Sequence, residues 1–413
     1  MSDRVRCVGT RGFSGILGMD DQRFEEVAAA VARHLPPSLV PIFNAGLVRS
    51  HLLFDEFVHR LTVRVCAETG LAEAASAWSS VGEIVARSGL DPDAGTVAVD
   101  WMLRHLAARG ILGREDTATG PRFRAERGLP AVDPAPVLAE QQGHDPACRP
   151  SYALAETAAR DYPAFLQGKK SGEDILLAAA RLPLWVAYFS NHNLLYAVNN
   201  HVGATAFEAW MPRGGGAVLE LGSGLGSGTI AVFERLDAVG RLSDVRAYRF
   251  TELIPAFLRR GQRNLEERFP HVPGLAFESL DMNRPFAEQG VAPGSVSIVY
   301  AVNTLHVAHD LAFTLAEVHR VLEPGGQLIF SECIRPFPGQ TVYPEFVFNL
   351  MRTFRAPRLH PRWRPNGGFL TAEQWTDALQ AAGFVDVRPL PDLTRIREVF
   401  PTFYSAASSA TRA

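Results

Sequence analysis

The sequence has little lysine and little cysteine, and it contains no long apolar run. Only two of its 41 basic residues are lysines, Lys169 and Lys170, and because the arginines run along the whole chain we interpret their excess as the codon bias of a GC-rich genome. The four cysteines lie far apart without a C-x-x-C pair, which argues against a zinc ribbon or a dense disulfide framework and favours a reducing, cytoplasmic location. No apolar stretch approaches the roughly 20 residues of a membrane span, and the first residues lack the apolar core of a signal peptide. We therefore expect no membrane partner.

What is present is the composition of an ordinary globular protein. The 413 residues are 47% hydrophobic and 21% charged, which fits two or three domains and argues against a mainly disordered chain. The formal net charge of −3 argues against a broadly basic nucleic-acid binder, so we expect no nucleic-acid partner.

Residues 1–150 are expected to form a mostly helical domain that contains a winged-helix-like unit. Ser80 followed by Glu83 is a capping-box pattern that opens a helix, and Pro92 lies where a second helix begins. Residues 111–126 then indicate two short strands around a polar turn. Two helices followed by a hairpin are typical of a winged helix.

Such a unit binds DNA in some proteins and pairs two chains in others. The second helix carries Asp93 and Asp100 beside only two arginines, Arg104 and Arg109. A helix that reads DNA usually carries more positive charge to offset the phosphates. The charges therefore favour dimerisation over DNA binding.

From about residue 214 onward, strand-like and helix-like segments alternate, which predicts an α/β sheet of largely parallel strands. Residues 217–229 read AVLELGSGLGSGT, an apolar strand that leads into Gly222, Gly224 and Gly226 and then into a helix. Glycines allow a sharp turn and let a ligand approach the main chain, and the helix beyond them offers free N–H groups. By spacing alone, this pattern is shared by dinucleotide sites and S-adenosylmethionine (SAM) sites.

Polar residues follow at the expected ends of successive strands. Glu252 lies 26 residues after Gly226, at the end of a second strand, where a carboxylate can accept hydrogen bonds from both ribose hydroxyls. Asp281 ends a third strand, where a carboxylate can bind an adenine amino group. Asn303 ends a fourth and either meets the cofactor through its main chain or caps the next helix. Glu220, which ends the first strand, either orients the SAM amino group or is a structural cap.

Taken together, ELGSGLGSGT, the acid at the end of the second strand, LDM and LEPGGQLIF resemble class I SAM-dependent methyltransferases. The segments YRFTELIPAFL, NTLHVAHDL and LEPGGQLIFSE are most similar to the C-methyltransferase domains of polyketide synthases, whereas the N-terminal part resembles the winged-helix dimerisation domain of small-molecule methyltransferases. The resemblance implies a Rossmann-like α/β domain over residues 211–413 whose seven-stranded sheet is completed by FVDVRPLP and VFPTFYSAAS. It also implies SAM as cofactor, S-adenosylhomocysteine (SAH) as product, and a homodimer. The cofactor-binding residues that it implies are Glu220, Gly222, Gly224, Gly226, Glu252, Leu253, Asp281, Met282 and Asn303.

A candidate catalytic pair follows from the same resemblance. In polyketide C-methyltransferases a histidine just past strand four pairs with a glutamate just after strand five, and these positions hold His306 and Glu332. A histidine of near-neutral pKa can remove an α-proton to give an enolate, and a carboxylate can fix its tautomer. The same pair can deprotonate a phenol, and the alternative is that His306 only caps a helix or packs. His309 lies on the same face, but no third metal ligand is evident and a solvent-facing role is favoured, so we predict no metal.

Residues 151–210 are expected to be a helical connector that forms part of the acceptor pocket. Its aromatic stripe has the spacing of one helix face and forms either core or a pocket wall. The stripe comprises Trp185, Tyr188, Phe189, His192 and Tyr196. Asn199, Asn200 and His201 follow as helix-end caps or pocket contacts.

An insertion at about 333–368 is expected to be a lid over an apolar acceptor, with Phe346 in the substrate pocket. The alternative is a solvated basic loop. Its arginines can bind a carboxylate or the phosphopantetheine phosphate of a carrier protein. They are Arg352, Arg355, Arg358, Arg362 and Arg364.

These observations predict a methyltransferase of bacterial secondary metabolism that methylates an enolisable carbon of a polyketide-like or keto-acid-like molecule, either free or bound to a carrier protein. Two other hypotheses stay open. One is an O- or N-methyltransferase of a small aromatic natural product. The other is a DNA-binding regulator that senses SAM, against which the intact glycine motif and the acidic second helix argue.

Overall fold

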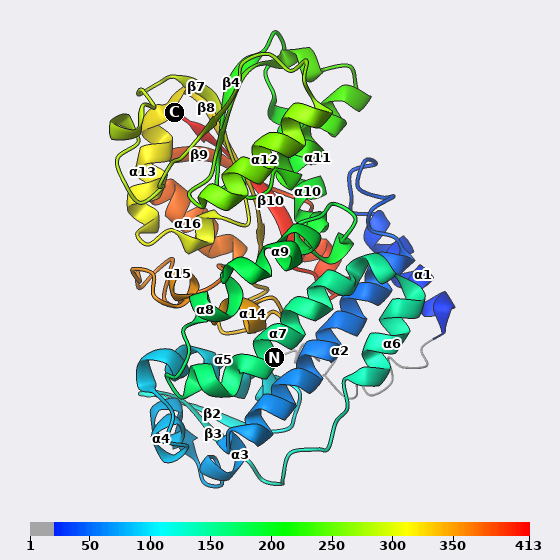
Figure 1. Cartoon of the computed structure of the whole chain (residues 1–413), viewed down its shortest axis with the longest axis vertical. Coiled ribbons are helices and arrows are strands. Elements are labelled where there is room, and N and C mark those ends of the chain that lie inside the picture. Colours follow the sequence, from blue (N-terminus) through cyan, green and yellow to red (C-terminus); the bar gives the residue numbers. More distant parts are fainter. Residues whose placement is uncertain (1–19) are drawn as a thin grey trace, which may run out of the picture. The chain divides into compact units, whose positions relative to one another are not determined.

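The computed structural model describes residues 20–413, so the predictions for the first residues and Cys7 lie outside the described part. The chain forms two compact units, and neither is continuous in sequence (Figure 1). The first unit comprises Arg49–Leu182, Gly339–Arg352 and the described residues up to Phe24. The second comprises Glu25–Val48, Pro183–Pro338 and Thr353–Ala413.

The first unit is mostly helical. Its longer helices are α2 (Ala45–Glu68, whose first residues belong to the second unit), α5 (Pro92–Ala108), α6 (Ala135–His144) and α7 (Arg149–Leu166). Shorter helices are α3 (Leu71–Ala74), α4 (Val81–Arg87), α8 (Gly172–Leu176) and α14 (Glu345–Phe348). A small antiparallel sheet has the order β1-β3-β2, from β1 (Ser79–Ser80), β2 (Gly113–Thr117) and β3 (Gly120–Arg124).

Helices α4 and α5 begin with the capping residues that the sequence predicted. The Ser80 side chain accepts from the Glu83 N–H while the Glu83 carboxylate accepts from the Ser80 N–H at 2.7 Å, which completes a capping box. Asp91 caps α5, and Pro92 occupies its first position. The order of helix, helix and hairpin is present, while the winged-helix assignment and its dimerising role stay predictions.

The segment 339–352 belongs to the helical unit, although the sequence places it between two strands of the other. The Trp101 indole N–H donates to Glu345 at 2.9 Å, and the Tyr162 hydroxyl donates to the Phe346 carbonyl at 2.5 Å. The expected boundaries at 150 and 210 therefore do not coincide with the limits of the compact units.

The second unit is built on one sheet of seven strands, as predicted. The strands are β4 (Gly216–Leu221), β5 (Val245–Thr251), β6 (Leu275–Glu278), β7 (Val296–Val302), β8 (Leu322–Cys333), β9 (Phe384–Leu390) and β10 (Ser405–Arg412). Their order is β6-β5-β4-β7-β8-β10-β9. The first five are parallel, and β10 pairs antiparallel with both β8 and β9. The parallel strands bring their carboxyl ends, and the motifs that follow them, to one edge.

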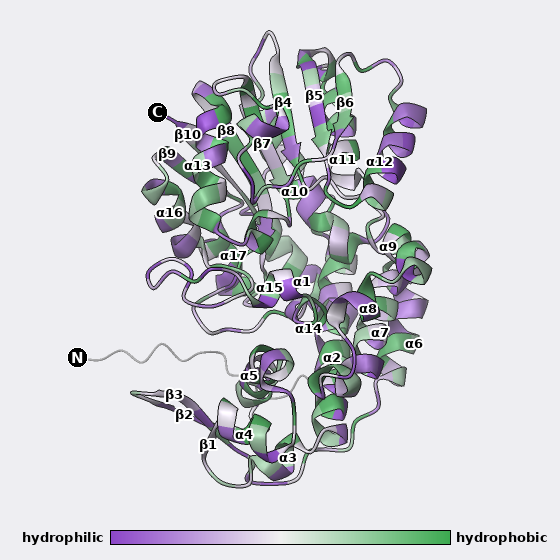
Figure 2. Ribbon diagram, turned by 60° about the vertical axis from the view of Figure 1, so that its left-hand side comes forward, coloured by the Kyte–Doolittle hydropathy of each residue, from purple (hydrophilic) through white to green (hydrophobic). Residues whose placement is uncertain are grey.

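The second unit also contains helices, several of which pack on the sheet. They are α1 (Asp21–Ala32, which begins in the first unit), α9 (Leu182–Tyr188), α10 (Leu194–Trp210), α11 (Ser227–Ala238), α12 (Pro255–Arg268), α13 (Leu311–Val321), α15 (Arg352–Arg355), α16 (Ala372–Ala381) and α17 (Leu393–Val399). Helix α10 packs against β7, β8, β10 and α11, while α13 packs on β8 and α16 on β9. Strand β7 is buried along almost its whole length. Helix α12 carries many hydrophilic residues, drawn in purple in Figure 2. Among residues 20–413, no helix combines the length and apolar character needed to cross a membrane.

Candidate cofactor and catalytic site

A glycine loop follows β4 at the carboxyl edge of the sheet. Gly222, Gly224 and Gly226 all have positive φ, at 60°, 59° and 87°, and Gly226 is the N-cap of α11. A Cβ on Gly222 would lie 2.1 Å from the Thr304 hydroxyl oxygen, so glycine is required there. A Cβ on Gly224 would meet open space. The loop therefore leaves main chain accessible beside the start of a helix, which suits close approach of a ligand.

The Glu252 carboxylate lies against this loop. One oxygen accepts from the Gly224 N–H at 2.9 Å and the other from the Ile254 N–H at 2.8 Å. Burial raises the pKa of Glu252, and the main-chain hydrogen bonds act in the opposite direction. The predicted juxtaposition of Glu252 and the glycine motif is thus present in the fold.

Glu220 is almost completely buried at the end of β4. One of its oxygens accepts from the Thr229 hydroxyl at 2.5 Å and from the Tyr248 hydroxyl at 2.8 Å, which joins β4 to α11 and β5. Burial raises the pKa of Glu220 to about 7, against the effect of these hydrogen bonds. The structural role that the sequence left open is therefore present, and contact with a SAM amino group stays a prediction.

The remaining predicted cofactor residues lie around the same edge. Leu253 is 54% exposed directly after Glu252, which is unusual for a large apolar side chain. Strand β6 ends at Glu278, so Asp281 and Met282 lie in the following turn rather than at the strand end. There the Asp281 carboxylate accepts from the Asn283 N–H at 2.9 Å.

Asn303 directly follows β7 and adopts a left-handed conformation with φ of 49°. Its side-chain oxygen accepts from the Asn199 amide at 3.0 Å. Asn199 is itself almost fully buried, and its own amide oxygen has no hydrogen-bond partner within the described chain. The sequence left open whether Asn199 and Asn200 cap a helix or contact the pocket. Asn199 is hydrogen-bonded to Asn303, the residue that follows β7.

His306 and Glu332 come together as predicted. His306 lies in a short 3-10 turn, Leu305–Val307, and its Nδ1 is 2.6 Å from a Glu332 carboxylate oxygen. The other oxygen accepts from the N–H groups of Thr304 and His306, at 3.1 and 3.2 Å. Both side chains are buried. Because a carboxylate accepts at Nδ1, the neutral ring carries its proton there and leaves Nε2 with a free lone pair.

Apolar rings surround His306. The Phe369 ring centroid lies 4.6 Å from the imidazole and that of Phe354 lies 5.6 Å away, nearly perpendicular to it. Both phenylalanines belong to the segment after Arg352, in the same compact unit as His306. The insertion, which was expected only to form a lid, therefore places two aromatic rings beside His306.

The arginines of the insertion have different partners from those expected. Arg358 pairs with Asp310 at 2.7 Å, and Arg362 pairs with Asp377 through two hydrogen bonds. Arg364 is completely buried and donates to the main-chain carbonyls of Ala308, at 2.8 Å, and His306. Arg364 therefore holds the turn that carries His306 and does not present its charge to a soluble anion.

The aromatic stripe does not lie on one helix as predicted. Helix α9 ends at Tyr188 and α10 begins at Leu194, so His192 lies in the connection and is exposed. Trp185, Tyr188 and Tyr196 still form one cluster through Phe189, with ring centroids 5.0 to 5.6 Å apart.

One member of this cluster reaches the glycine loop. The hydroxyl groups of Tyr196 and Ser227 are hydrogen-bonded at 3.2 Å, and Ser227 is the first residue of α11. Phe346, by contrast, is fully buried in the helical unit against Trp101 and Tyr162, so it is a core residue there. The prediction of Phe346 as a pocket residue does not fit this packing.

Within residues 20–413, no group of three or more His, Cys, Asp or Glu side chains is arranged to hold a metal ion. His309 is exposed, and its N–H donates to the Asn283 side chain at 2.7 Å.

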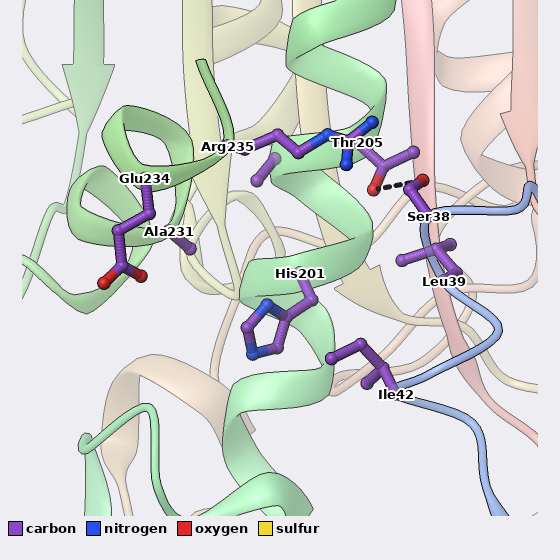
Figure 3. Close-up of a pocket in the computed structure, with 9 residues that line it drawn as sticks. Ser38, Leu39, Ile42, His201, Thr205, Ala231, Glu234 and Arg235 are labelled. Atoms are coloured by element: carbon purple, nitrogen blue, oxygen red, sulfur yellow. Dashed lines mark hydrogen bonds between the residues drawn. The ribbon is translucent and has the colours of Figure 1, made fainter. Parts of the chain in front are cut away.

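A separate small pocket of about 210 Å³ lies between α10, α11 and the segment before α2. Figure 3 shows that Thr205 projects from α10 toward Ser38, with their hydroxyl groups 3.4 Å apart, and that His201 projects from the same helix. The pocket includes none of the residues predicted to bind cofactor or acceptor, and of the undecided residues only His201 lines it.

Five residues of the site were not predicted from the sequence. They are Thr304, Thr229, Tyr248, Phe354 and Phe369. Thr229 directly follows the glycine motif, whereas Tyr248 lies in a strand with two arginines and gives no distinct sequence signal. Thr304 precedes the predicted base by two residues, but its packing on Gly222 is a tertiary contact that no spacing rule gives.

Comparison with known proteins agrees with this geometry. Residues 219–328 match the family described as a methyltransferase domain. The chain is 25% identical over 248 residues to the highly reducing polyketide synthase frbB of Dothideomycetidae sp. (strain 11243), covering 58% of this chain and 9% of the synthase. It thus spans less than a tenth of the length of that curated relative.

Solved structures share the fold. The CurJ carbon methyltransferase superposes with a TM-score of 0.74 at 20% identity, covering 94% of this chain and 99% of that one. The trans-methyltransferase CalH, solved in complex with SAH, has a TM-score of 0.57 at 20% identity, covering 87% of this chain and 90% of that one. At these identities the similarity establishes the fold.

Proposed function

We propose that this class I SAM-dependent methyltransferase methylates an enolisable carbon beside a carbonyl group, with His306 as the base. The observation that carries the proposal is the buried 2.6 Å contact between His306 Nδ1 and Glu332. The chain's similarity to polyketide synthases, and the fold that it shares with a carbon methyltransferase, support the same reaction class. The identity of the methylated atom is part of the proposal.

SAM is the cofactor of this domain, and the site fits it. The glycine loop offers accessible main chain, the Glu252 carboxylate lies beside it, and the exposed Leu253 offers an apolar surface for an aromatic ring. When bound, SAM supplies the methyl group to the acceptor carbon and leaves as SAH. We assign Gly222, Gly224 and Glu252 to its binding.

The protein's own contribution is to remove a proton and hold its base in place. His306 Nε2 takes the α-proton of the acceptor, and the electron pair of the broken C–H bond becomes the enolate nucleophile. The imidazolium that results is stabilised by Glu332, whose second oxygen is held by two N–H groups of the same turn. Phe354 and Phe369 keep water from the base, which strengthens these charge interactions.

The acceptor that best suits this site is a β-ketoacyl thioester, because its α-carbon is acidic enough for a histidine base. Since the relatives are polyketide synthases, we propose that the acyl group is presented on a carrier protein. A homodimer, a cytoplasmic location and a role in bacterial secondary metabolism belong to the same proposal.

The test uses SAM with a ¹³C-labelled methyl group and a panel of β-ketoacyl thioesters, α-keto acids, phenols and amines. The ¹³C chemical shift of the product reports which atom carries the new methyl group. We expect a carbon-bound methyl from a β-ketoacyl thioester. A methyl bound to oxygen or nitrogen, with no carbon product, would show that the reaction class is wrong.

Two variants test the catalytic pair. We expect His306→Ala and Glu332→Gln to lose at least 100-fold in kcat, in the range of general-base catalysis, while the Kd for SAM changes little. His309→Ala is the matched control, because this exposed histidine lies three residues away. Normal turnover in the first two variants would remove the pair from the mechanism.

A further inference from the structure

The turn that carries His306 has an anion at one end and a cation at the other. At its start, one Glu332 oxygen accepts from the N–H groups of Thr304 and His306. At its end, the Arg364 guanidinium donates to the carbonyls of His306 and Ala308. The charges match the direction of the peptide dipoles, whose positive end faces Glu332 and whose negative end faces Arg364.

Both charges are completely buried, yet they do not contact each other. Arg364 and Glu332 each have zero exposed surface, and Arg364 makes no carboxylate ion pair within residues 20–413. Its Nε has no hydrogen-bond partner in that part of the chain. Burial lowers the pKa of Arg364 to about 10, and attraction to Glu332 and then Asp310 opposes that effect, so the group stays charged at neutral pH.

Burying an arginine on two carbonyls is costly, since a charge leaves water without a bonded counter-ion. A neutral donor side chain could hold the same two carbonyls without burying a charge. The guanidinium is bonded to the main-chain carbonyl of His306 itself, so its positive charge lies beside that residue. A nearby like charge disfavours the charged form of a titratable group.

We propose that Arg364 is a positioning residue whose buried positive charge keeps His306 neutral, and therefore ready to accept a proton, at physiological pH. It does so while its two hydrogen bonds fix the turn. The inference rests on the proposed function, because it assigns His306 the role of base. Glu332 alone favours the charged imidazolium, and Arg364 counterbalances that tendency.

The other charged or titratable groups near the turn are few. Glu332 comes from β8 and is followed by Cys333, which is buried. Asp310 caps α13 and pairs with the exposed Arg358, and His309 is exposed. Two further arginines lie on the elements that supply the rings: Arg355, half-buried after Phe354, and Arg335, buried, whose main-chain N–H donates to the Leu370 carbonyl next to Phe369. Arg364 differs from both because its guanidinium is hydrogen-bonded to the turn itself.

The direct test is the titration of His306 by NMR in protein labelled with ¹³C-histidine, without acceptor, with His306→Gln identifying the signal. We expect Arg364→Gln to raise the titration midpoint by about one pH unit, in the range that a nearby charge produces. Arg364→Lys keeps the charge but reaches fewer carbonyls, so its midpoint stays at the native value. The control is Arg358→Gln, which removes an exposed lid arginine and leaves the midpoint unchanged.

Kinetics supply the second readout. The low-pH limb of kcat/KM is expected to move upward in Arg364→Gln by the same interval as the NMR midpoint, and to stay in place in Arg364→Lys while kcat falls. An unchanged midpoint in a folded Arg364→Gln protein that binds SAM normally would overturn the inference. If that variant does not fold, a midpoint in Arg364→Lys that rises by a full unit would overturn it too.

The two proposals fail separately. If the methyl group proves to be on oxygen or nitrogen, the proposed function fails, while the NMR titration still measures the effect of Arg364 on His306. If carbon methylation and the His306→Ala loss are observed but the midpoint does not move, the charge role of Arg364 fails and the proposed function stands.

Discussion

At the scale of single residues, the site depends on close approaches that one added carbon would prevent. Gly222 is the clearest case, because its positive φ and its contact with Thr304 both exclude a side chain. Gly240, at the end of α11, has a similar φ of 69° but open space around it. Comparing alanine substitutions at Gly222 and Gly240 therefore distinguishes the cost of a left-handed backbone from the cost of a steric clash.

We predict that Gly222→Ala loses measurable SAM binding, because the new methyl group displaces Thr304 and with it the end of β7. Gly240→Ala should cost about 1–2 kcal/mol of folding stability, from the left-handed conformation alone, with no change in SAM affinity. Isothermal titration and thermal melts measure the two quantities. The double variant Gly222→Ala with Thr304→Ala should recover part of the affinity, and equal affinities in Gly222→Ala and the native protein would contradict the steric argument.

The role of a residue could be predicted from the sequence where a motif determines it. It could not be predicted where tertiary packing determines it. His306 and Glu332 follow from their places after two strands, and the structure brings them to 2.6 Å. Arg364 lies in an arginine-rich insertion, where its neighbours Arg358 and Arg362 form surface ion pairs. Nothing in that run of charges distinguishes the buried arginine from the exposed ones.

At the scale of elements, hydrophobic patterning predicted the strands well and a helix junction badly. The first five strands fall close to where apolar runs and turn residues placed them. The resemblance supplied the last two, and the last one, β10, is Ser405–Arg412 rather than residues 399–408. The aromatic stripe suggested one helix, but the chain breaks between α9 and α10, where the Asn193 amide donates to the Tyr188 carbonyl at 2.9 Å. An asparagine that binds local main chain competes with helix continuation, an effect that periodicity does not include.

The link between α10 and α11 should affect cofactor affinity. Tyr196→Phe removes the hydrogen bond to Ser227, worth about 1 kcal/mol of folding stability. We also expect SAM to bind more weakly, because the start of α11 is then less firmly held beside the glycine loop. Tyr188→Phe is the control, since this neighbouring tyrosine has no hydroxyl hydrogen bond among the described residues. Identical dissociation constants for the two variants would show that the link does not orient the loop.

At the scale of the whole molecule, the two compact units are not consecutive segments of the chain. The chain passes from one compact unit to the other after Phe24, Val48, Leu182, Pro338 and Arg352. Sequence reasoning placed boundaries in proline-rich or polar stretches, which is sound for domains in series. It cannot detect a segment such as 339–352, whose apolar residues pack on helices more than 170 positions earlier.

A fragment experiment follows from this connectivity. Residues 211–413 hold all seven strands but lack α10, which packs on β7, β8 and β10. We predict that this fragment does not fold cooperatively or bind SAM, whereas a fragment of residues 183–413, which keeps α9 and α10, retains more helical signal and a measurable melting transition. Circular dichroism and SAM titration compare them, and a well-folded 211–413 fragment would show that α10 is dispensable.

The place of β10 in the sheet also sets an order of events during synthesis. This strand lies between β8 and β9, so β8 keeps an open edge and β9 has no strand partner until residues 405–412 have been made. An unpaired buried strand is a template for wrong pairing with other chains. Until residues 405–412 have been made, the nascent chain therefore leaves the β8 edge at Glu332 uncovered, and Glu332 gains its neighbour Ala406 only when the sheet closes.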